Sequence, residues 1–284
     1  MQIIDGKALA KRIRENLKVE VDELKNKGII PKLAVILVGE DPASQIYVRN
    51  KSKACNEVGI EFEEIILSEE TTMIELLNII DNLNERKDIT GILLQSPIPK
   101  HLDINEAFRR ISPEKDVDGF NPINVGKLCL NQDTFVSCTP YGIMKMLEAY
   151  NTDPRGKHAV ILGRSNIVGK PMSLCLLNKD ATVTICHSKT QNLKEITKQA
   201  DILVAAIGKK HFVTADMVKD GAVVIDVGIN RTEEGLFGDV DFENVKEKAS
   251  LITPVPGGVG PMTIAMLLNN VVKGTRNLFV ENLN

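Results

Sequence analysis

The stretch KLAVILVG, residues 32–39, is a nearly continuous apolar run. A strand that is covered on both faces has this pattern, whereas a strand with one solvated face alternates apolar and polar residues. Two further strand segments follow, EFEEIIL (61–67) and TGILLQSPIP (90–99), with helical patterns between them. This strand–helix–strand–helix–strand order predicts a parallel sheet with right-handed crossovers.

The segment ASQIYVRNKSKACNEV (43–58), between the first two strands, is predicted to be one helix. Asp41 can cap its start, and Pro42 suits the first helical position. Positions at helical spacing form a stripe that we expect to be buried, with Val48 as an apolar exception on the opposite face. The stripe places the Lys51 ammonium on a buried face, where an unpaired charge is costly. Its members are Ala43, Ile46, Tyr47, Asn50, Lys51, Ala54, Cys55 and Val58.

Two more helices and a loop-rich segment complete this part of the chain. Asp5 is expected to cap a helix that runs to about Lys27, and a second helix is expected over 72–86. Residues 112–140 contain three prolines and are expected to be loop-rich and to join two lobes. A helix capped by Thr139 should follow.

The rest of the chain repeats the alternation of strands and helices, which predicts a second, doubly wound parallel sheet. The segment 231–242 has the pattern of a hairpin, and a last long helix is expected to start at Pro261. That helix is long enough to pack on the first lobe. The expected strands are 158–163, 181–188, 201–208 and 222–230, and the expected helices are 168–178 and 191–199.

The predicted fold is therefore α/β, with two lobes and a cleft between them. The N-terminal lobe is a βαβ parallel sheet completed by the C-terminal helix, and the C-terminal lobe is a Rossmann-like doubly wound parallel sheet. The expected domain boundaries place residues 1–140 and 262–284 in the first lobe and residues 141–261 in the second.

Composition excludes several classes of partner. A net charge of -3 and a pI near 5.9 favour no nucleic-acid ligand, and Trp, which stacks well on bases, is absent. No apolar run approaches the roughly 20 residues of a membrane span, so we expect no membrane partner. Five scattered cysteines and four histidines form no ligand spacing, which predicts no metal and reduced thiols in a cytoplasmic protein.

The stretch HAVILGRSNIVGKPM (158–172) is predicted to form a strand, a turn and a helix, which is the context of a dinucleotide-binding turn. Gly163 allows the tight turn, and Gly169 allows close contact between helix and strand. Ser165 stands where the second glycine of the usual fingerprint would be. The amides at the helix start still offer an anion site.

The end of the next strand, ICHSKT, carries no acidic residue. Sites that prefer NAD place an Asp or Glu there to bind the ribose hydroxyls. Arg164, Ser188 and Lys189 could bind a 2′-phosphate instead, which favours NADP over NAD without excluding NAD. An ordinary solvated turn is the alternative interpretation.

Three polar features of the first lobe are candidates for a ligand site. Gln95 lies at the carboxyl end of a strand, where open α/β sheets bind ligands. Asp116 and Asp118 lie in the inter-lobe segment, and the glycines of ITPVPGGVGPMT (252–263) let a flat ligand approach the backbone. Each feature has a structural alternative: Gln95 could simply hydrogen-bond a loop, Asp118 could cap a turn, and the glycines could form a flexible connection. The Lys51 side chain, likewise, could extend to solvent from the edge of its stripe.

Several longer motifs identify a family. The chain resembles the bifunctional methylenetetrahydrofolate dehydrogenase/methenyltetrahydrofolate cyclohydrolases over essentially its whole length. The resemblance implies that NADP⁺ takes hydride from 5,10-methylenetetrahydrofolate, and that water then opens the methenyl product to 10-formyltetrahydrofolate in the same cleft. It also implies a homodimer formed through the cofactor lobe. The matching motifs are YVRNK, LLQSPIP, PEKDVDGF, GRSNIVGKP, TVTICHSKT, IDVGIN and TPVPGGVGPMT.

The resemblance implies roles for individual residues. Lys51 is the catalytic base and acid, Gln95 supports it, Tyr47 flanks the folate, and Asp118 holds the pterin. Further substrate-binding candidates are Leu94, Ser96, Pro256, Gly257, Gly258, Pro261 and Thr263. The cofactor-binding candidates are Gly163, Arg164, Ser165, Ser188 and Ile229.

The implied chemistry explains a lysine on a buried helix face. Lys51 follows Tyr47 by one helical turn, so both side chains can reach one ligand. A lysine at its reference pKa is protonated at neutral pH and is a poor base. Burial and a cationic folate both favour the neutral amine, which can accept and return a proton. Because hydride transfer depends mainly on positioning, we expect Lys51 to matter more for hydrolysis.

Other functions are possible for a Tyr-x-x-x-Lys pair. Short-chain dehydrogenases use such a pair, but their cofactor fingerprint precedes it, whereas here the pair precedes the turn at Gly163 by over a hundred residues. A monofunctional member of the same family remains an alternative, and so does a non-catalytic protein that binds folate or nucleotide.

Overall fold

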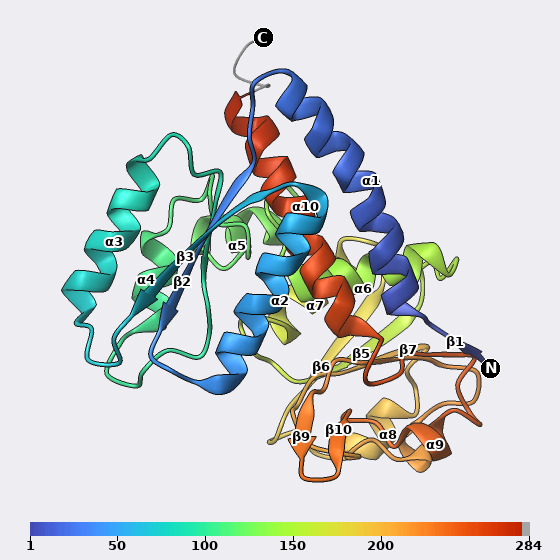
Figure 1. Ribbon diagram of the computed structural model, residues 1–284. Coiled ribbons are helices and arrows are strands. Elements are labelled where there is room, and N and C mark those ends of the chain that lie inside the picture. The colour runs from blue at the N-terminus through green and yellow to red at the C-terminus, as the bar shows by residue number, and fades with distance from the viewer. Residues whose placement is uncertain (280–284) are drawn as a thin grey trace. The chain divides into compact units, whose positions relative to one another are not determined.

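The computed structural model describes residues 1–279, which form two compact units (Figure 1). The six-stranded unit comprises Met1–Ala10 and Thr139–Thr263, and the three-stranded unit comprises Lys11–Cys138 and residues 264–279. The units differ from the expected domains at the N-terminus, because β1 (Gln2–Ile3) pairs with β11 (Leu251–Ile252). Residues 280–284 of the expected first domain lie outside the described residues.

The six-stranded unit contains the predicted parallel sheet, in the order β1-β11-β8-β7-β5-β6. The strand order reverses next to β5, because β6 lies on one side of it and β7 on the other. Such a reversal creates a ligand crevice at the carboxyl ends of the strands. The remaining bounds are β5 His158–Leu162, β6 Thr182–Cys186, β7 Ile202–Ala205, β8 Val223–Asp226, α6 Cys138–Ala149, α7 Gly169–Leu177, α8 Leu193–Thr197, η1 Ala215–Met217 and α9 Phe242–Val245.

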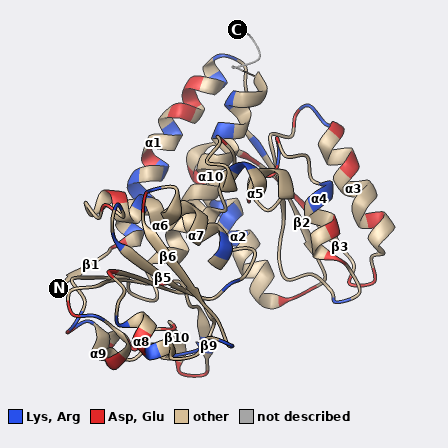
Figure 2. Cartoon of the chain, turned by 180° about the vertical axis from the view of Figure 1, so that it is seen from behind, with Lys and Arg blue, Asp and Glu red and all other residues tan. Residues whose placement is uncertain are grey.

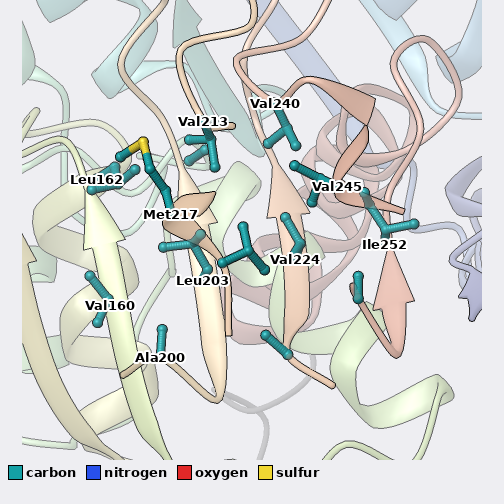
Figure 3. Packing of buried hydrophobic residues seen from close by; sticks show 14 of the residues in the cluster. Val160, Leu162, Ala200, Leu203, Val213, Met217, Val224, Val240, Val245 and Ile252 are labelled. Carbon is teal, nitrogen blue, oxygen red and sulfur yellow. The ribbon is translucent and has the colours of Figure 1, made fainter. Parts of the chain in front are cut away.

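The core of this unit lies against one face of its sheet. Figure 3 shows Val160, Leu203 and Val224, from three neighbouring strands, pointing into a cluster that Met217 and Val245 cover. All five side chains are at least 92 % buried. Full burial of an apolar side chain of this size contributes about 1.5–3 kcal/mol. The sheet is therefore a rigid support for the loops that leave its carboxyl edge.

The three-stranded unit has the predicted parallel sheet, in the order β3-β2-β4. Every residue of β2 (Lys32–Val38) after Lys32 is buried, as its continuous apolar run predicts. Flanking strands are β3 (Glu61–Leu67) and β4 (Gly91–Leu94), which is shorter than expected. The helices of this unit are α2 Pro42–Val58, α3 Met73–Glu85, α4 Ile104–Arg110 and α5 Pro122–Cys129, and α1 (Gly6–Asn26) enters it from the other unit.

The C-terminal helix α10 (Val259–Phe279) completes the three-stranded unit, as predicted. The Asn270 side-chain amide donates hydrogen bonds to Val117 O at 2.8 Å and to Val136 O at 3.1 Å. The Thr275 hydroxyl donates to the Thr90 hydroxyl at 2.9 Å. The helix begins two residues before Pro261, which lies inside its first turn.

Two segments differ in part from the expectation. Residues 112–140 are loop-rich, as expected, but α5 forms among them with Asn121 as its cap and Pro122 in its first turn. The Asn121 side chain accepts from Ile123 N at 2.8 Å, so the proline marks a helix start. Thr139 is not a cap, because α6 already begins at Cys138; instead the Thr139 and Thr263 hydroxyls share a hydrogen bond of 2.9 Å.

The surface carries both signs of charge. Figure 2 shows Lys and Arg interspersed with Asp and Glu along α1, where Lys11–Glu15 and Lys18–Asp22 form pairs one turn apart. The hairpin expected over 231–242 is present as antiparallel β9 (Asn230–Thr232) and β10 (Gly235–Phe237). Within residues 1–279, no helix combines the length and apolar character needed to cross a membrane.

Candidate active site

Helix α2 carries the candidate lysine and begins and ends where the sequence predicts. Asp41 accepts a hydrogen bond from Ser44 N at 2.7 Å, and Pro42 occupies the first turn. Gly59 ends the helix in the left-handed conformation, with φ of 86°. These signals fix the helix ends independently of the rest of the fold.

The buried side of α2 is rotated from the predicted stripe. Val48 is 1 % exposed, whereas Ile46 and Tyr47 are 43 % and 41 % exposed. Lys51 is partly buried and lies between the Tyr47 side and the buried side that continues through Cys55. Packing against the sheet selects Val48, because periodicity alone cannot choose between it and the neighbouring apolar pair. The stripe was wrong for Ala43, Ile46, Tyr47 and Asn50, which are exposed.

The structure joins Lys51 to Gln95. Lys51 Nζ donates a hydrogen bond to Gln95 Oε1 at 2.8 Å. Gln95 directly follows β4, is 6 % exposed, and is fixed by its own amide, which donates from Nε2 to Ser96 O at 2.6 Å. Because Gln95 is neutral, it holds the lysine without stabilising the ammonium as a carboxylate would.

Burial sets the electrostatics of Lys51. Desolvation lowers the pKa of its amine, and the negative charge of Asp118 opposes this shift. Desolvation likewise raises the pKa of Asp118, which the lysine charge counteracts. The two partly buried groups therefore influence each other's pKa. A lysine with a lowered pKa near a carboxylate is an arrangement typical of acid–base catalysis.

Two thiols near Lys51 were not predicted as site residues. Burial raises the pKa of Cys55 to about 12 and that of Cys138 well above its usual value, so both are neutral thiols at pH 7. Cys138 is 2 % exposed, and its thiol donates to Val117 O at 3.4 Å. The one-turn spacing from Lys51 could have identified Cys55, whereas the position of Cys138 follows only from the fold.

Asp116 organises the loop that presents Asp118. Its carboxylate is 2 % exposed and accepts from Asn121 N at 2.7 Å and from Asn124 Nδ2 at 2.8 Å. Desolvation raises its pKa to about 6. Gly119, with φ of 73°, has no room for a side chain, because a Cβ there would lie 2.7 Å from Ser137 N. The first acid of the DVDG motif is thus structural, and the second is the one near Lys51.

The other substrate candidates of this unit lie in different surroundings. Tyr47 is exposed on α2 and available to a ligand. The Leu94 side chain is 1 % exposed and packs in the core with Ile36 and Leu76, so it is not available to a ligand. Ser96 is exposed directly after Gln95.

The turn after β5 has the tight geometry predicted for a dinucleotide site. Gly163 has φ of 117°, and a Cβ there would overlap the Ala206 carbonyl oxygen. A Cβ on Gly169 would overlap the Gly163 carbonyl oxygen. Both positions therefore require glycine, one for the turn and one for contact between α7 and the turn.

Ser165 replaces the second fingerprint glycine with a specific local role. Its hydroxyl accepts hydrogen bonds from Val168 N at 3.1 Å and Gly169 N at 3.3 Å. These amides are the free donors that the start of a helix offers to an anion. The expected anion site at this helix is thus partly occupied by a side chain of the protein itself.

The carboxyl ends of β5 and β6 suit a phosphorylated ribose. Leu162 and Cys186 are register partners in these strands, and the exposed Arg164 and the exposed segment Ser188–Lys189 follow them. No acidic residue stands in either turn. The glycine turn and the two cations fit NADP. Ile229, which is 47 % exposed, follows β8 at the same sheet edge.

The glycine-rich segment before α10 packs mainly on its own unit. Lys7 N donates to Gly257 O at 3.0 Å, and a Cβ on Gly6 would overlap the Gly258 carbonyl oxygen. Gly258 itself has Pro254 O at 2.5 Å from where a Cβ would lie. The predicted openness to a ligand therefore does not hold at buried Gly258. Pro256 is exposed, and Gly257, Pro261 and Thr263 are partly exposed.

Two family profiles cover most of the chain. Residues 4–118 match "Tetrahydrofolate dehydrogenase/cyclohydrolase, catalytic domain". Residues 137–279 match "Tetrahydrofolate dehydrogenase/cyclohydrolase, NAD(P)-binding domain". The first match contains Lys51, Gln95 and Asp118, and the second contains the turn at Gly163.

Relatives share both sequence and structure with the chain. The bifunctional protein FolD of Campylobacter concisus is 59% identical over 99% of this chain and 100% of its own length. The crystal structure of the Campylobacter jejuni FolD has a TM-score of 0.97 and 54% identity, covering 98% of this chain and 99% of that one. The Trypanosoma brucei FolD structure, complexed with NADP cofactor and an inhibitor, has a TM-score of 0.93 and 38% identity, with 97% of each chain covered.

Proposed function

The chain belongs to the tetrahydrofolate dehydrogenase/cyclohydrolase family, and we propose that Lys51 is the general base and acid of its hydrolytic reaction. Its two activities are the NADP-dependent oxidation of 5,10-methylenetetrahydrofolate and the hydrolysis of the methenyl product to 10-formyltetrahydrofolate. The observation that carries the proposal is the desolvated Lys51 amine, which the neutral amide of Gln95 holds at 2.8 Å.

Hydrolysis requires one group that removes a proton and later returns it. Water adds to the cationic methenyl carbon, and neutral Lys51 takes a proton from that water as the C–O bond forms. The resulting ammonium then protonates the ring nitrogen as its bond to carbon breaks, and the remaining hydroxyl proton is released to water as the formyl C=O forms. Burial lowers the pKa of Lys51, and a cationic substrate acts in the same direction because like charges repel.

The neighbours of Lys51 complete this proposal. Gln95 Oε1 positions the amine in either protonation state, because both forms have a hydrogen to donate. Tyr47, exposed one turn earlier, is assigned to stack against the folate ring. Asp118 is assigned to accept hydrogen bonds from pterin N–H groups. The positive charge of the Lys51 ammonium favours the ionised form of the Asp118 carboxylate.

We assign folate binding to the three-stranded unit and cofactor binding to the six-stranded unit. NADP⁺ bound there would supply the hydride acceptor for the one-carbon bridge. The backbone at Gly163 admits the pyrophosphate, while Arg164, Ser188 and Lys189 bind the 2′-phosphate in preference to an unphosphorylated ribose. Ser165 and Ile229 are the remaining cofactor contacts. Ser96, and Leu94 through its backbone, are assigned to the substrate.

We further propose that the protein is a cytoplasmic homodimer formed through the six-stranded unit. The β9–β10 hairpin supports this assignment, since it extends from the sheet with Arg231–Gly235 exposed. The cysteines within the described residues are free thiols, which suits a reducing compartment. Light scattering during size-exclusion chromatography tests the dimer, and a monomer at micromolar concentration would contradict it.

Two assays on the purified protein test the catalytic proposal. The first follows NADPH formation from 5,10-methylenetetrahydrofolate with NADP⁺ and, separately, with NAD⁺. The second follows the loss of the methenyl chromophore without any cofactor. We expect both activities, with a higher kcat/KM for NADP⁺ than for NAD⁺. Activity in only one assay would identify a monofunctional enzyme, and binding without turnover in either would identify a non-catalytic protein.

A further inference from the structure

Two buried aspartates lie beneath the loops at the carboxyl edge of the six-stranded sheet. Asp226 ends β8 and is 3 % exposed, and Asp239 follows the β9–β10 hairpin and is fully buried. Asp239 lies outside the family motifs identified from the sequence, whereas Asp226 is the acidic residue of IDVGIN. Neither residue has a role in the proposed mechanism. Buried carboxylates are rare unless the surrounding structure satisfies them.

The Asp239 carboxylate binds two other segments of the chain. Its Oδ2 accepts from Ile207 N at 2.7 Å and Gly208 N at 3.0 Å, in the loop that follows β7. Its Oδ1 accepts from Lys209 N at 2.8 Å and from Asn230 Nδ2 at 3.0 Å. One carboxylate thus collects four donors from the loop after β7 and from the start of the hairpin.

Asp226 holds Asp239 in place. Its Oδ1 accepts from Asp239 N and from Gly228 N, both at 2.9 Å, and its Oδ2 accepts from Val240 N at 2.9 Å. A side chain on Gly228 would overlap the Asp239 carboxylate, and one on Gly238 would overlap the Asp226 carboxylate. Backbone and carboxylates therefore fit together without space for alternatives.

The Asp226 carboxylate is costly to bury. Burial raises the pKa of Asp226 to about 6, even though three backbone amides favour its ionised form, and the neighbouring Asp239 adds to the rise. The N–H groups that bind the pair come from main chain and from one asparagine, so no cation in these contacts offsets the charge. A well-packed apolar pair would avoid this cost. The presence of Asp226 and Asp239 is explained if they fix the backbone of a ligand-binding site.

The segments that the pair holds include proposed cofactor contacts. Ile229 lies between Gly228, which donates to Asp226, and Asn230, which donates to Asp239. The loop after β7 starts with Ala206, whose carbonyl oxygen lies where a Gly163 side chain would be. The same two carboxylates thus fix the main chain on the β8 side of the proposed NADP site and the loop against its glycine turn.

We propose that Asp239 is a positioning residue for the nicotinamide dinucleotide, with Asp226 fixing Asp239 through its backbone. This inference rests on the proposed assignment of NADP to the six-stranded unit. Loss of the Asp239 charge would release the 207–209 backbone and the segment that carries Ile229, and both are required only for the cofactor. Folate hydrolysis, which is assigned to the other unit, would remain.

Asp239→Asn tests the proposal, because it keeps the size of the side chain but directs an amide at some of the four donors. Asp220→Asn is the matched control, because it removes the same charge from a position before β8 where the side chain is 86% exposed. NADPH affinity is measured by calorimetry, with KM for NADP⁺ and for folate, the cofactor-free cyclohydrolase rate, and a thermal unfolding curve.

We expect Asp239→Asn to weaken NADPH binding and raise KM for NADP⁺ by about tenfold, the equivalent of one lost hydrogen bond to a charged group. KM for folate and the cyclohydrolase rate should stay within about twofold of the wild-type values, and the control should match the wild type. Unchanged NADPH affinity in a folded Asp239→Asn variant would overturn this inference and leave the proposed function intact.

A second variant keeps the test decisive if Asp239→Asn does not fold. Asn230→Ala removes one donor to Asp239 at a partly exposed position, and a smaller loss of NADPH affinity, about threefold, is expected. Wild-type affinity in Asn230→Ala would then refute the positioning role. If the wild-type protein itself bound no NADPH, the cofactor assignment would fail together with this inference.

Discussion

Lys51 on α2 and Gln95 at the end of β4 meet through a 2.8 Å hydrogen bond, in which the lysine donates to a neutral acceptor. The Gln95 amide is itself oriented by the Ser96 carbonyl oxygen, so its Oε1 faces the lysine. The sheet therefore places the amine without adding a negative charge at the contact. This distinction determines how the site should respond to substitution and pH.

Lys51→Met should abolish most of the cyclohydrolase activity while part of the dehydrogenase activity remains. General acid–base catalysis contributes about 10²- to 10⁴-fold, and methionine fills similar space without a proton to transfer. The fold should tolerate the change, because a desolvated amine is replaced by an apolar chain. Both activities are measured with NADPH affinity as the control for cofactor binding. Equal loss of both activities with NADPH affinity intact would refute the assigned role.

Gln95→Glu should shift the pH profile of the cyclohydrolase upward. In the wild type the active form is the neutral amine, so the rate rises with pH as Lys51 deprotonates through its lowered pKa. A carboxylate at hydrogen-bond distance favours the ammonium and raises that pKa, so activity at neutral pH should fall and recover at higher pH. Rates corrected for spontaneous hydrolysis measure the shift. A parallel decrease at every pH would indicate lost geometry instead of a changed pKa.

Arg164→Ala should reduce the preference for NADP⁺ over NAD⁺. Loss of a charged contact to the 2′-phosphate should raise KM for NADP⁺ by about tenfold and leave KM for NAD⁺ nearly unchanged. Lys198→Ala, which removes a positive charge from an exposed position in the same unit, is the control. An equal effect on the two cofactors would mean that Arg164 does not recognise the phosphate.

Gly163→Ala should impair cofactor binding with little effect on hydrolysis. Alanine at φ of 117° is strained, and its Cβ would collide with the Ala206 carbonyl oxygen, so the turn must shift at a cost of about 1–3 kcal/mol. NADPH calorimetry and the cofactor-free cyclohydrolase assay measure the two effects. Gly126→Ala in α5, where a Cβ meets no atom within 4 Å, should be neutral or stabilise by up to about 1 kcal/mol. Normal NADPH binding in Gly163→Ala would show that the turn is not part of the cofactor site.

Much of the fold follows from local patterns in the chain. The apolar run of β2, the Asp41-Pro42 start of α2 and the Gly59 end each encode an element through short-range preferences, and all three are present. Glycine spacing likewise predicted the tight turn at Gly163. The resemblance that identified the family depends on continuous motifs of the same local kind.

Features that depend on tertiary packing were missed or misplaced. Periodicity placed Tyr47 on the buried side of α2 and Val48 on the other, because the helix has too few apolar residues to define its rotation. Asn121-Pro122 was interpreted as loop, since proline marks both loops and helix starts. The Ser165 hydroxyl accepts hydrogen bonds from two amides of its own turn. Nothing in the sequence distinguishes this role from direct binding of a cofactor phosphate.

The sequence by itself determined the two parallel sheets, the helix ends and the chemical identity of the candidate catalytic groups, because these depend on residue type and on spacing within a few turns. Only the tertiary structure decided that Lys51 meets Gln95, that Cys138 lies near the lysine and that β1 joins the six-stranded sheet. Those contacts join residues far apart in the chain, and packing of whole helices and strands, which minimises exposed apolar surface, selects them.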